Sequence, residues 1–158
     1  AAERKRLEAI RKAQKAADAR RAAKARAALA TSLSIVSSRV QKVVKYALSK
    51  VGHRYSFGSS GPSSYDCSGL VMASYRQIGI ALPHYSRAQY SATRRVSRGS
   101  LRPGDIVFFF GHGIKHVGIY IGHNQFVHAA NYRYGVIVTS LGDPYYLMRI
   151  SGYGRVVR

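Results

Sequence analysis

The sequence predicts an α+β domain in which helices come first and an antiparallel sheet follows, preceded by a basic helical arm. Three observations predict this fold class. Residues 1–30 are almost entirely alanine, lysine and arginine. Between residues 38 and 79, apolar residues recur at the three- and four-residue spacing of amphipathic helices. From residue 105 on, short β-branched and aromatic runs are divided by glycine, histidine and asparagine, as in strands joined by turns.

The chain divides into an arm with its linker, residues 1–37, and a globular domain, residues 38–158. Alanine and long straight side chains favour helix in the arm. Its apolar residues other than alanine are too few for a core face: Leu7, Ile10 and Leu29. We expect a solvated helical arm, part of a coiled coil or a stalk, and a plain spacer is an equally good interpretation. The stretch "TSLSIVSS" breaks the pattern and is predicted to be a linker.

Two amphipathic helices are predicted at the start of the domain. The first is "RVQKVVKYALSKVG", which ends at Gly52. A Gly/Ser/Pro loop, "HRYSFGSSGPSS", follows. The second helix opens at Cys67 and stops at Gly79. Residues 80–104 are expected to be mostly turn, with a short helix around Ser86 to Ser91.

The strands are predicted from four short runs and one longer one. They are "DIVFFF", "HVGIYI", "QFVHAA", "GVIVTSL" and, last, "YYLMRISGYGRVVR". Because helices precede a meander of strands, we expect an antiparallel sheet covered by the helices.

One hairpin decides how two histidines are placed. If "GHN" is a three-residue connection, Ile121 pairs with Gln125 and Gly118 lies opposite His128. His116 is then a diagonal neighbour of His128 on the same face, about 7–8 Å away. A two-residue turn would place the two histidines on opposite faces, because side chains alternate along a strand.

The charge of the chain points to anionic partners. The formal net charge is +20, which favours nucleic acid, anionic lipid or the phosphate-rich polymers of a bacterial envelope. Nucleic acid is disfavoured because no recognised binding module is present. No apolar run is long enough to span a membrane, and "AAERKRLEAI" lacks the apolar region of a signal peptide. An exported protein would therefore be represented here in processed or trimmed form.

Acidic residues are scarce, and this disfavours two kinds of site. From residue 31 on, the acids are Asp66, Asp105 and Asp143. A glycosidase normally needs two carboxylates across the scissile bond. A calcium or magnesium site needs several oxygen ligands of this kind. Both interpretations are weak for this chain.

Cys67 is the only cysteine, so no internal disulfide can form. A single thiol fits the cytosol, and it also fits an exported enzyme that keeps the thiol free for chemistry. The plain interpretation is a small buried hydrophobe. The position at a helix start favours a nucleophile, because the unpaired N–H groups there stabilise a thiolate and an oxyanion. Asp66 or Ser64 is the expected helix cap.

A cysteine nucleophile needs a base and a group that orients it. The hairpin predicts His116 as the base and His128 as the orienting group. Zinc is the competing interpretation, since one cysteine and two histidines can form an open catalytic site, but the usual ligand spacings are absent. We therefore expect neither a metal nor a cofactor. The remaining histidines fall in predicted loops and are not expected to be catalytic: His53, His84, His112 and His123.

Five motifs, in order, resemble the NlpC family of bacterial cell-wall cysteine peptidases: "YDCSGLV", "LPHYSRAQ", "LRPGDIVFF", "HVGIYIG" and "FVHAA". The resemblance covers residues 38–158. It implies a papain-like fold and a triad of Cys67, His116 and His128. It also implies secretion to the bacterial envelope and cleavage of peptidoglycan stem peptides, usually between the γ-carboxyl of D-glutamate and a diamino acid. No cofactor is implied.

The resemblance also implies three substrate-binding residues. Asp66 and Ser68 match positions that contact the amino-terminal part of the peptide, and Tyr55 matches an aromatic donor to the oxyanion. The family loop often reads Tyr-x-Trp-Gly-Gly, whereas this chain has "YSFGSS", and His84 stands where arginine is common. These differences concern the pocket and leave the triad intact.

Three alternative functions stay open. The same Cys-His chemistry suits an amidase or acyltransferase acting on another acyl bond. A binder of nucleic acid or wall polymer without enzymatic activity is the second alternative. An inactive relative is the third, and the intact triad disfavours it.

Overall fold

The computed structural model describes residues 1–32 and 35–157. Leu33 and Ser34 of the expected linker, and Arg158, lie outside this part of the chain. The elements in order are α1 (Ala2–Ser32), α2 (Ser38–Ser49), β1 (Arg54–Tyr55), β2 (Ser64–Tyr65), α3 (Cys67–Arg76), α4 (Ser86–Ala92), β3 (Arg94–Val96), η2 (Arg98–Ser100), β4 (Ile106–Phe109), η3 (Gly111–Gly113), β5 (His116–Gly122), β6 (Gln125–Ala129), β7 (Val136–Ser140), α5 (Pro144–Leu147) and β8 (Ile150–Arg155).

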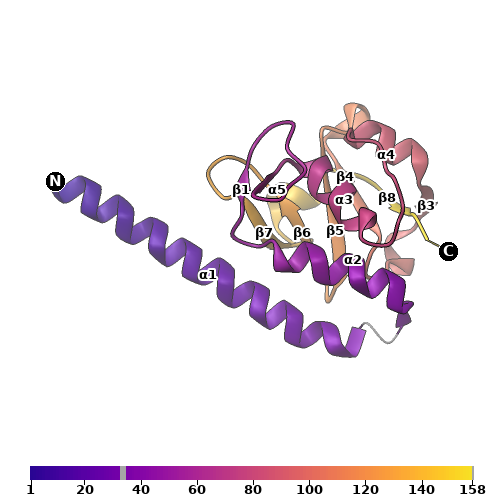
Figure 1. The fold of residues 1–158 in the computed structure, drawn as a ribbon, viewed down its shortest axis with the longest axis horizontal. Coiled ribbons are helices and arrows are strands. Elements are labelled where there is room, and N and C mark those ends of the chain that lie inside the picture. Colours follow the sequence, from indigo (N-terminus) through magenta and orange to yellow (C-terminus); the bar gives the residue numbers. More distant parts are fainter. Residues whose placement is uncertain (33–34, 158) are drawn as a thin grey trace.

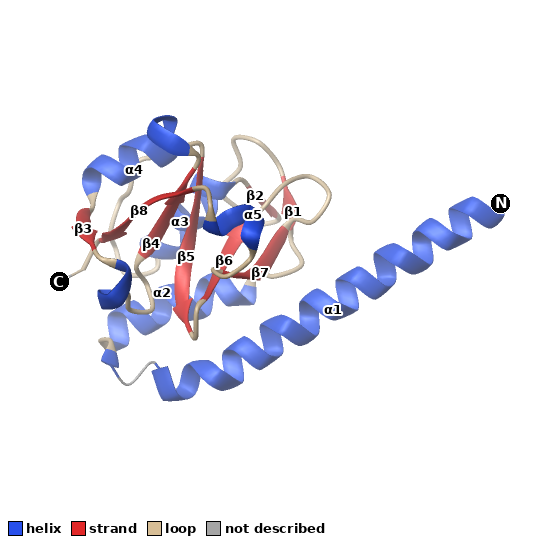
Figure 2. Ribbon diagram, turned by 180° about the vertical axis from the view of Figure 1, so that it is seen from behind, coloured by secondary structure: helices blue, strands red, loops and turns tan. Residues whose placement is uncertain are grey.

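The six-stranded sheet has the order β3-β8-β4-β5-β6-β7, and every neighbouring pair is antiparallel (Figures 1 and 2). Strands β4 to β7 form the expected meander, and β8 returns to pair with the other side of β4. β3 and β7 are the two edge strands. The predicted α+β class with an antiparallel sheet is confirmed.

Helices α2 and α3 cover one face of the sheet and form the main core with it. The apolar face of α2 is buried as its spacing predicts, and Ser37 caps the helix by accepting from the Val40 N–H. On the sheet side, Val117, Ile119 and Val127 point into this core. A smaller cluster on the opposite face contains Phe109 and Phe126. The sheet is therefore buried on both faces near its centre.

The arm forms one helix, α1, of 31 residues. Its amino-terminal end stands clear of the domain, whereas its later part lies along β7 and β5 (Figures 1 and 2). Ala22 and Ala25 are buried there, because small side chains let the helix approach the sheet closely. Arg21 Nη1 also donates to the carbonyl of Val138 on the edge strand, at 3.0 Å. The expectation of a solvated arm is therefore corrected for this part of α1.

The side chains of the β5–β6 hairpin lie on the predicted faces, but the turn that joins the two strands differs from the prediction. His123 and Asn124 form a two-residue turn with φ of +50° and +58°, and Gly122, not Ile121, pairs with Gln125. The register shifts between Tyr120 and Gly122, and the extra residue of this bulge restores the alternation. Beyond it, Ile119 pairs with Val127, so that His116 and His128 share a face as expected.

Several short elements differ from the predictions. The Gly/Ser/Pro loop contains the parallel pair β1 and β2, and the region expected to be mostly turn contains β3. Residues 144–147 form helix α5, not the start of the last strand, because Asp143 caps the segment and Pro144 occupies its first turn.

Among the described helices, none combines the length and the apolar character that crossing a membrane requires.

Candidate active site

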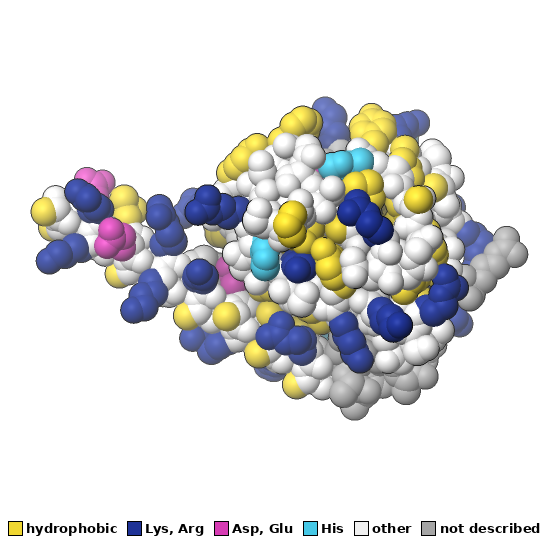
Figure 3. Space-filling model, viewed as in Figure 1, with side chains coloured by type: hydrophobic (Ala, Val, Ile, Leu, Met, Phe, Trp, Pro, Cys, Tyr) yellow, Lys and Arg dark blue, Asp and Glu magenta, His cyan; other side chains and the backbone are white. Residues whose placement is uncertain are grey.

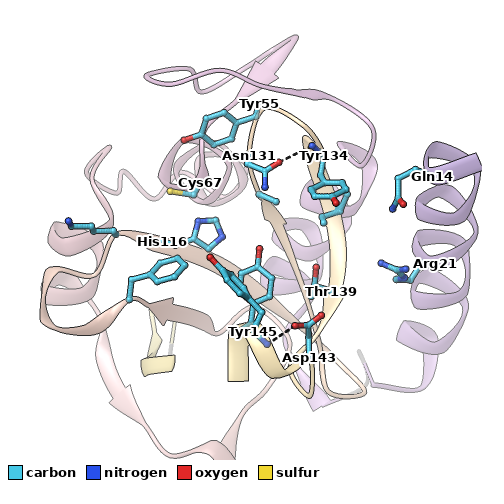
Figure 4. Close-up of a pocket in the computed structure, with 15 residues that line it drawn as sticks. Gln14, Arg21, Tyr55, Cys67, His116, Asn131, Tyr134, Thr139, Asp143 and Tyr145 are labelled. Atoms are coloured by element: carbon cyan, nitrogen blue, oxygen red, sulfur yellow. Dashed lines mark hydrogen bonds between the residues drawn. The ribbon is translucent and has the colours of Figure 1, made fainter. Parts of the chain in front are cut away.

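A cleft of about 1050 Å³ contains the cysteine predicted as the nucleophile. Cys67 is the first residue of α3, and His116 is the first residue of β5. Both line the cleft together with Tyr55. Figure 4 shows these three side chains at one end of the cleft and α1 at the other. The fold thus brings residues from three distant segments to one end of a shared cavity.

Burial opposes the ionisation of the Cys67 thiol, whereas backbone hydrogen bonds favour it. Burial raises its pKa to about 11, with a smaller contribution from Asp66. Backbone hydrogen bonds of Ser68 and Val117 lower the pKa but do not offset burial. The expected ionisation by the helix start is therefore corrected for the free site, where the thiol is neutral at pH 7. Val117 follows His116 directly, so the thiol lies beside the start of β5.

The imidazoles of His116 and His128 form a buried chain of hydrogen bonds that ends at a threonine. His116 Nε2 lies 2.8 Å from His128 Nδ1, and His128 Nε2 lies 2.8 Å from Thr139 Oγ1. If His128 donates its Nε2–H to the hydroxyl, its Nδ1 accepts the Nε2–H of His116. Nδ1 of His116 is then the ring nitrogen left to accept a proton. One proton arrangement therefore prepares His116 as a base.

Burial also keeps both imidazoles neutral. It lowers the pKa of His116 to about 4, and it lowers that of His128 well below its usual value, helped by His116. Aromatic rings enclose the two imidazoles. The ring centroid of His128 lies 4.4 Å from that of Phe126 and 5.1 Å from that of Tyr146 in α5. Phe109 lies 5.7 Å from His116. This shell explains why neither imidazole is charged in the free site.

Within the described residues, no hydrogen bond joins Cys67 Sγ to His116. Catalytic hydrogen bonds are often long in a free enzyme and shorten when substrate binds. Neutral thiol and neutral imidazole therefore face one cleft, and the sulfur can transfer its proton to His116 as it attacks a carbonyl.

Tyr55 and the start of α3 can stabilise an oxyanion. Burial, with a contribution from Cys67, raises the pKa of Tyr55 to about 12, so its hydroxyl remains a donor at neutral pH. The N–H groups at the start of α3 are free of intrahelical partners. Tyr132 packs edge-on against Tyr55, with ring centroids 4.8 Å apart, and helps to fix the ring.

Asp66 and Ser68 lie behind the nucleophile and do not line the cleft. Asp66 caps α3 by accepting from Gly69 N–H at 2.7 Å, and its other oxygen accepts from Gly58 N–H at 2.7 Å. His84 Nε2 lies 2.8 Å from the same carboxylate. These bonds fix the loop around Cys67. The expected contact of Asp66 and Ser68 with substrate stays a prediction.

The other histidines do not join the cluster. His53 bonds the carbonyl of Lys50, His112 lies in η3, and His123 bonds the carbonyl of Ala28. Among residues 1–32 and 35–157, no group of three or more His, Cys, Asp or Glu side chains is arranged to hold a metal ion.

Sequence reasoning missed Thr139 and Tyr146. Thr139 could have been found from alternation in "GVIVTSL", since it shares a face with Ile137, which pairs with His128. Tyr146 could not, because its segment was assigned to a strand.

Comparison with known proteins gives a consistent result. A family model described as the NlpC/P60 family matches residues 52–155. The solved structure of the peptidoglycan hydrolase RipB from Mycobacterium tuberculosis superposes with a TM-score of 0.67 and 27% identity, over 81% of this chain and 72% of that one.

Two curated relatives are similar in sequence. The probable endopeptidase p60 of Listeria monocytogenes is 39% identical over 115 residues, which cover 72% of this chain and 23% of that protein. The murein DD-endopeptidase MepS/murein LD-carboxypeptidase of Escherichia coli is 44% identical over 108 residues, which cover 67% of this chain and 57% of that protein. The chain therefore spans between about a quarter and somewhat over half of these relatives' length.

Proposed function

The chain belongs to the NlpC/P60 family, and from this membership we propose that it is a peptidoglycan endopeptidase with Cys67 as nucleophile. The observation that carries the proposal is the cleft that Cys67 and His116 both line, with His116 joined by hydrogen bonds to His128 and through it to Thr139. The relatives' names support the reaction and the substrate, since p60 is named a probable endopeptidase and MepS a murein DD-endopeptidase. We assign the cleaved amide to the stem peptide, between the γ-carboxyl of D-glutamate and a diamino acid.

The reaction follows from the neutral resting pair. Sγ of Cys67 attacks the amide carbonyl while His116 Nδ1 takes the thiol proton, and a carbon–sulfur bond forms. The N–H groups at the start of α3 and the Tyr55 hydroxyl stabilise the oxyanion. His116 then gives its proton to the leaving amine as the carbon–nitrogen bond breaks. Water, activated by His116, hydrolyses the thioester and restores the thiol. His128 keeps His116 in the required tautomer throughout.

Digestion of purified peptidoglycan, followed by mass spectrometry of the soluble fragments, tests this function. The wild-type protein should release stem-peptide fragments whose ends identify the bond. Cys67→Ala and treatment with iodoacetamide should abolish release, and EDTA should leave it unchanged. Release by Cys67→Ala would refute the nucleophile, and release that EDTA blocks would favour zinc.

Two histidine variants test the roles of the imidazoles. His128→Ala should lower kcat only in part, because an orienting group contributes less than the nucleophile. His123→Ala, on the β5–β6 turn, should change activity little and is the matched control. The opposite order of effects would refute the assigned roles.

An amidase or acyltransferase is the alternative that the same experiment separates. The relative MepS is named both a DD-endopeptidase and an LD-carboxypeptidase, so one similar protein is named for two different bonds. Fragments that end at another amide would assign that bond. Acyl transfer to an added amine without hydrolysis would instead show a transferase.

We also propose that the basic surface holds the protein on anionic wall polymers at the envelope. Lys and Arg side chains follow the arm and spread over the face of the domain shown in Figure 3, with few acids among them. Replacing the exposed Arg4, Lys5, Arg6, Arg11 and Lys12 by glutamine should weaken retention on purified walls and make it less salt-sensitive. Unchanged retention would refute a role for the arm.

A further inference from the structure

Helix α1 forms the wall of the cleft that lies opposite the nucleophile. Gln14 and Arg21 line the same cavity as Cys67 and His116. They are seven residues apart, which places them on one face of the helix, and Figure 4 shows both pointing from α1 toward the cleft. Ala22 and Ala25 pack that part of α1 onto the domain. The arm therefore contributes side chains to the cavity in addition to its charge.

Arg21 is held in place on this wall. Its Nη1 donates to the Val138 carbonyl at 3.0 Å, which fixes it to the edge strand β7. Asp18, only 7% exposed, accepts from Gln14 Nε2 at 3.1 Å, and its Oδ1 lies 3.9 Å from Arg21 Nη1. A side chain anchored on both its own helix and the sheet loses less entropy when it binds a ligand.

The position of Arg21 relative to His116 identifies the part of the substrate it faces. His116 protonates the leaving amine, so the leaving portion must lie on the His116 side of the broken bond. From His116 the hydrogen-bonded chain runs through His128 to Thr139, the neighbour in sequence of Val138, which holds Arg21. An extended peptide advances about 3.3–3.6 Å per residue, so a leaving portion a few residues long extends along this side of the cleft.

The chemistry of Arg21 suits a carboxylate. Its side chain is 44% exposed, and in the described part of the chain Nε and Nη2 donate no hydrogen bond. A guanidinium presents parallel N–H groups that match a carboxylate in two-point contact. Asp143, the acid that lines this cleft, uses Oδ1 to cap α5 through the Tyr145 N–H at 2.9 Å. The leaving portion of a stem peptide that is not cross-linked at its end terminates in a carboxylate.

We infer that α1 is a substrate-binding wall and that Arg21 binds a carboxylate on the leaving side of the cleaved amide. The inference rests on the proposed endopeptidase function and adds a specificity-determining residue to it. It gives the arm a role in selecting peptides with a free acid end.

Two synthetic stem peptides test the inference, one with a free C-terminal carboxylate and one with a C-terminal amide. The wild-type protein should show a KM about tenfold lower for the acid, with similar kcat, which is the lower end expected for a charged hydrogen bond at a half-exposed site. Arg21→Gln should remove the preference. Arg20→Gln should retain it, since Arg20 is exposed on the same helix but does not line the cleft.

Binding measured by calorimetry in the Cys67→Ala background separates recognition from reaction. The acid should bind about tenfold more tightly than the amide, and adding Arg21→Gln should remove this difference. Equal affinities for the two peptides, or a preference that survives Arg21→Gln, would overturn the inference and leave the proposed function standing. An acid preference in binding without cleavage of either peptide would support recognition by Arg21 and overturn the proposed reaction.

Discussion

Thr139 supplies the acceptor that His128 needs in the proton arrangement that makes His116 a base, so replacing Thr139 by valine should impair catalysis. In that arrangement the hydroxyl accepts the Nε2–H of His128, whose Nε2 lies 2.8 Å away in a site where His128 is fully buried. Valine has nearly the same shape but offers no acceptor. His128 must then leave Nε2–H unpaired or move its proton to Nδ1. In the second case His128 donates to His116 Nε2, and the proton of His116 moves to Nδ1, where it blocks the base.

The magnitude follows from the cost of the unpaired group. A buried donor without a partner costs about 1–3 kcal/mol, and each 1.36 kcal/mol is tenfold in rate, so kcat should fall roughly 5- to 150-fold. KM should change little, because valine keeps nearly the shape of threonine on the cleft lining and His128 does not line the cleft. Thr139→Ser keeps the hydroxyl and is the matched control.

Steady-state hydrolysis of a defined stem peptide measures this effect. The nitrogen chemical shifts of the two histidines, measured by NMR, report which ring nitrogen carries the proton. Thr139→Val should shift the population toward the Nδ1–H tautomer of His116. A Thr139→Val protein with kcat within twofold of Thr139→Ser would refute the positioning role.

Three further predictions concern the structure around the site. Gly118→Ala should lower both kcat and stability, the latter by about 1–3 kcal/mol, because the new Cβ would lie 3.1 Å from the Cβ of His128; unchanged thermal unfolding and activity would contradict it. Asp105→Ala should lower the free energy of unfolding by about 3–5 kcal/mol in urea, since it leaves the largely buried Arg155, now bonded to both carboxylate oxygens at 2.8 and 2.9 Å, without its partner; a loss below 1 kcal/mol would argue against this. Burial lowers the folded-state pKa of His116 to about 4 from 6.5, so its stabilising contribution is complete above pH 6.5 and is lost as the pH falls from 6.5 to 4. Urea unfolding across this range should show a steeper loss than His116→Asn shows, and equal slopes would contradict the prediction.

The helices and the main strands could be predicted because each shows its own periodicity. Val43 and Val44 in α2 and the runs that became β4 to β7 are buried as their spacing indicates. The sequence predicted that His116 and His128 share a face of the β5–β6 hairpin, although it did not predict the turn. Two compensating changes, a shorter turn and a bulge, leave the alternation unchanged, and sequence pattern alone does not distinguish them.

The ionisation of the site could not be predicted from sequence. The helix start indicates a lowered thiol pKa, but the folded protein buries the thiol and raises its pKa. The burial of the two imidazoles depends on Phe109, Phe126 and Tyr146, which come from three different elements. The role of α1 could not be predicted either. A helix of alanine, lysine and arginine shows no apolar stripe, and its docking depends on two alanines and on Arg21 at an edge strand.

The acyl-enzyme is the most direct test of attack by Cys67. A stem peptide mixed with the protein and quenched in acid within the first turnover should add to the protein the mass of the peptide's acyl portion, without the leaving amine. Digestion should place this mass on the peptide that contains Cys67, and His116→Ala should not accumulate it. Turnover without any such adduct, or an adduct on another residue, would contradict the account.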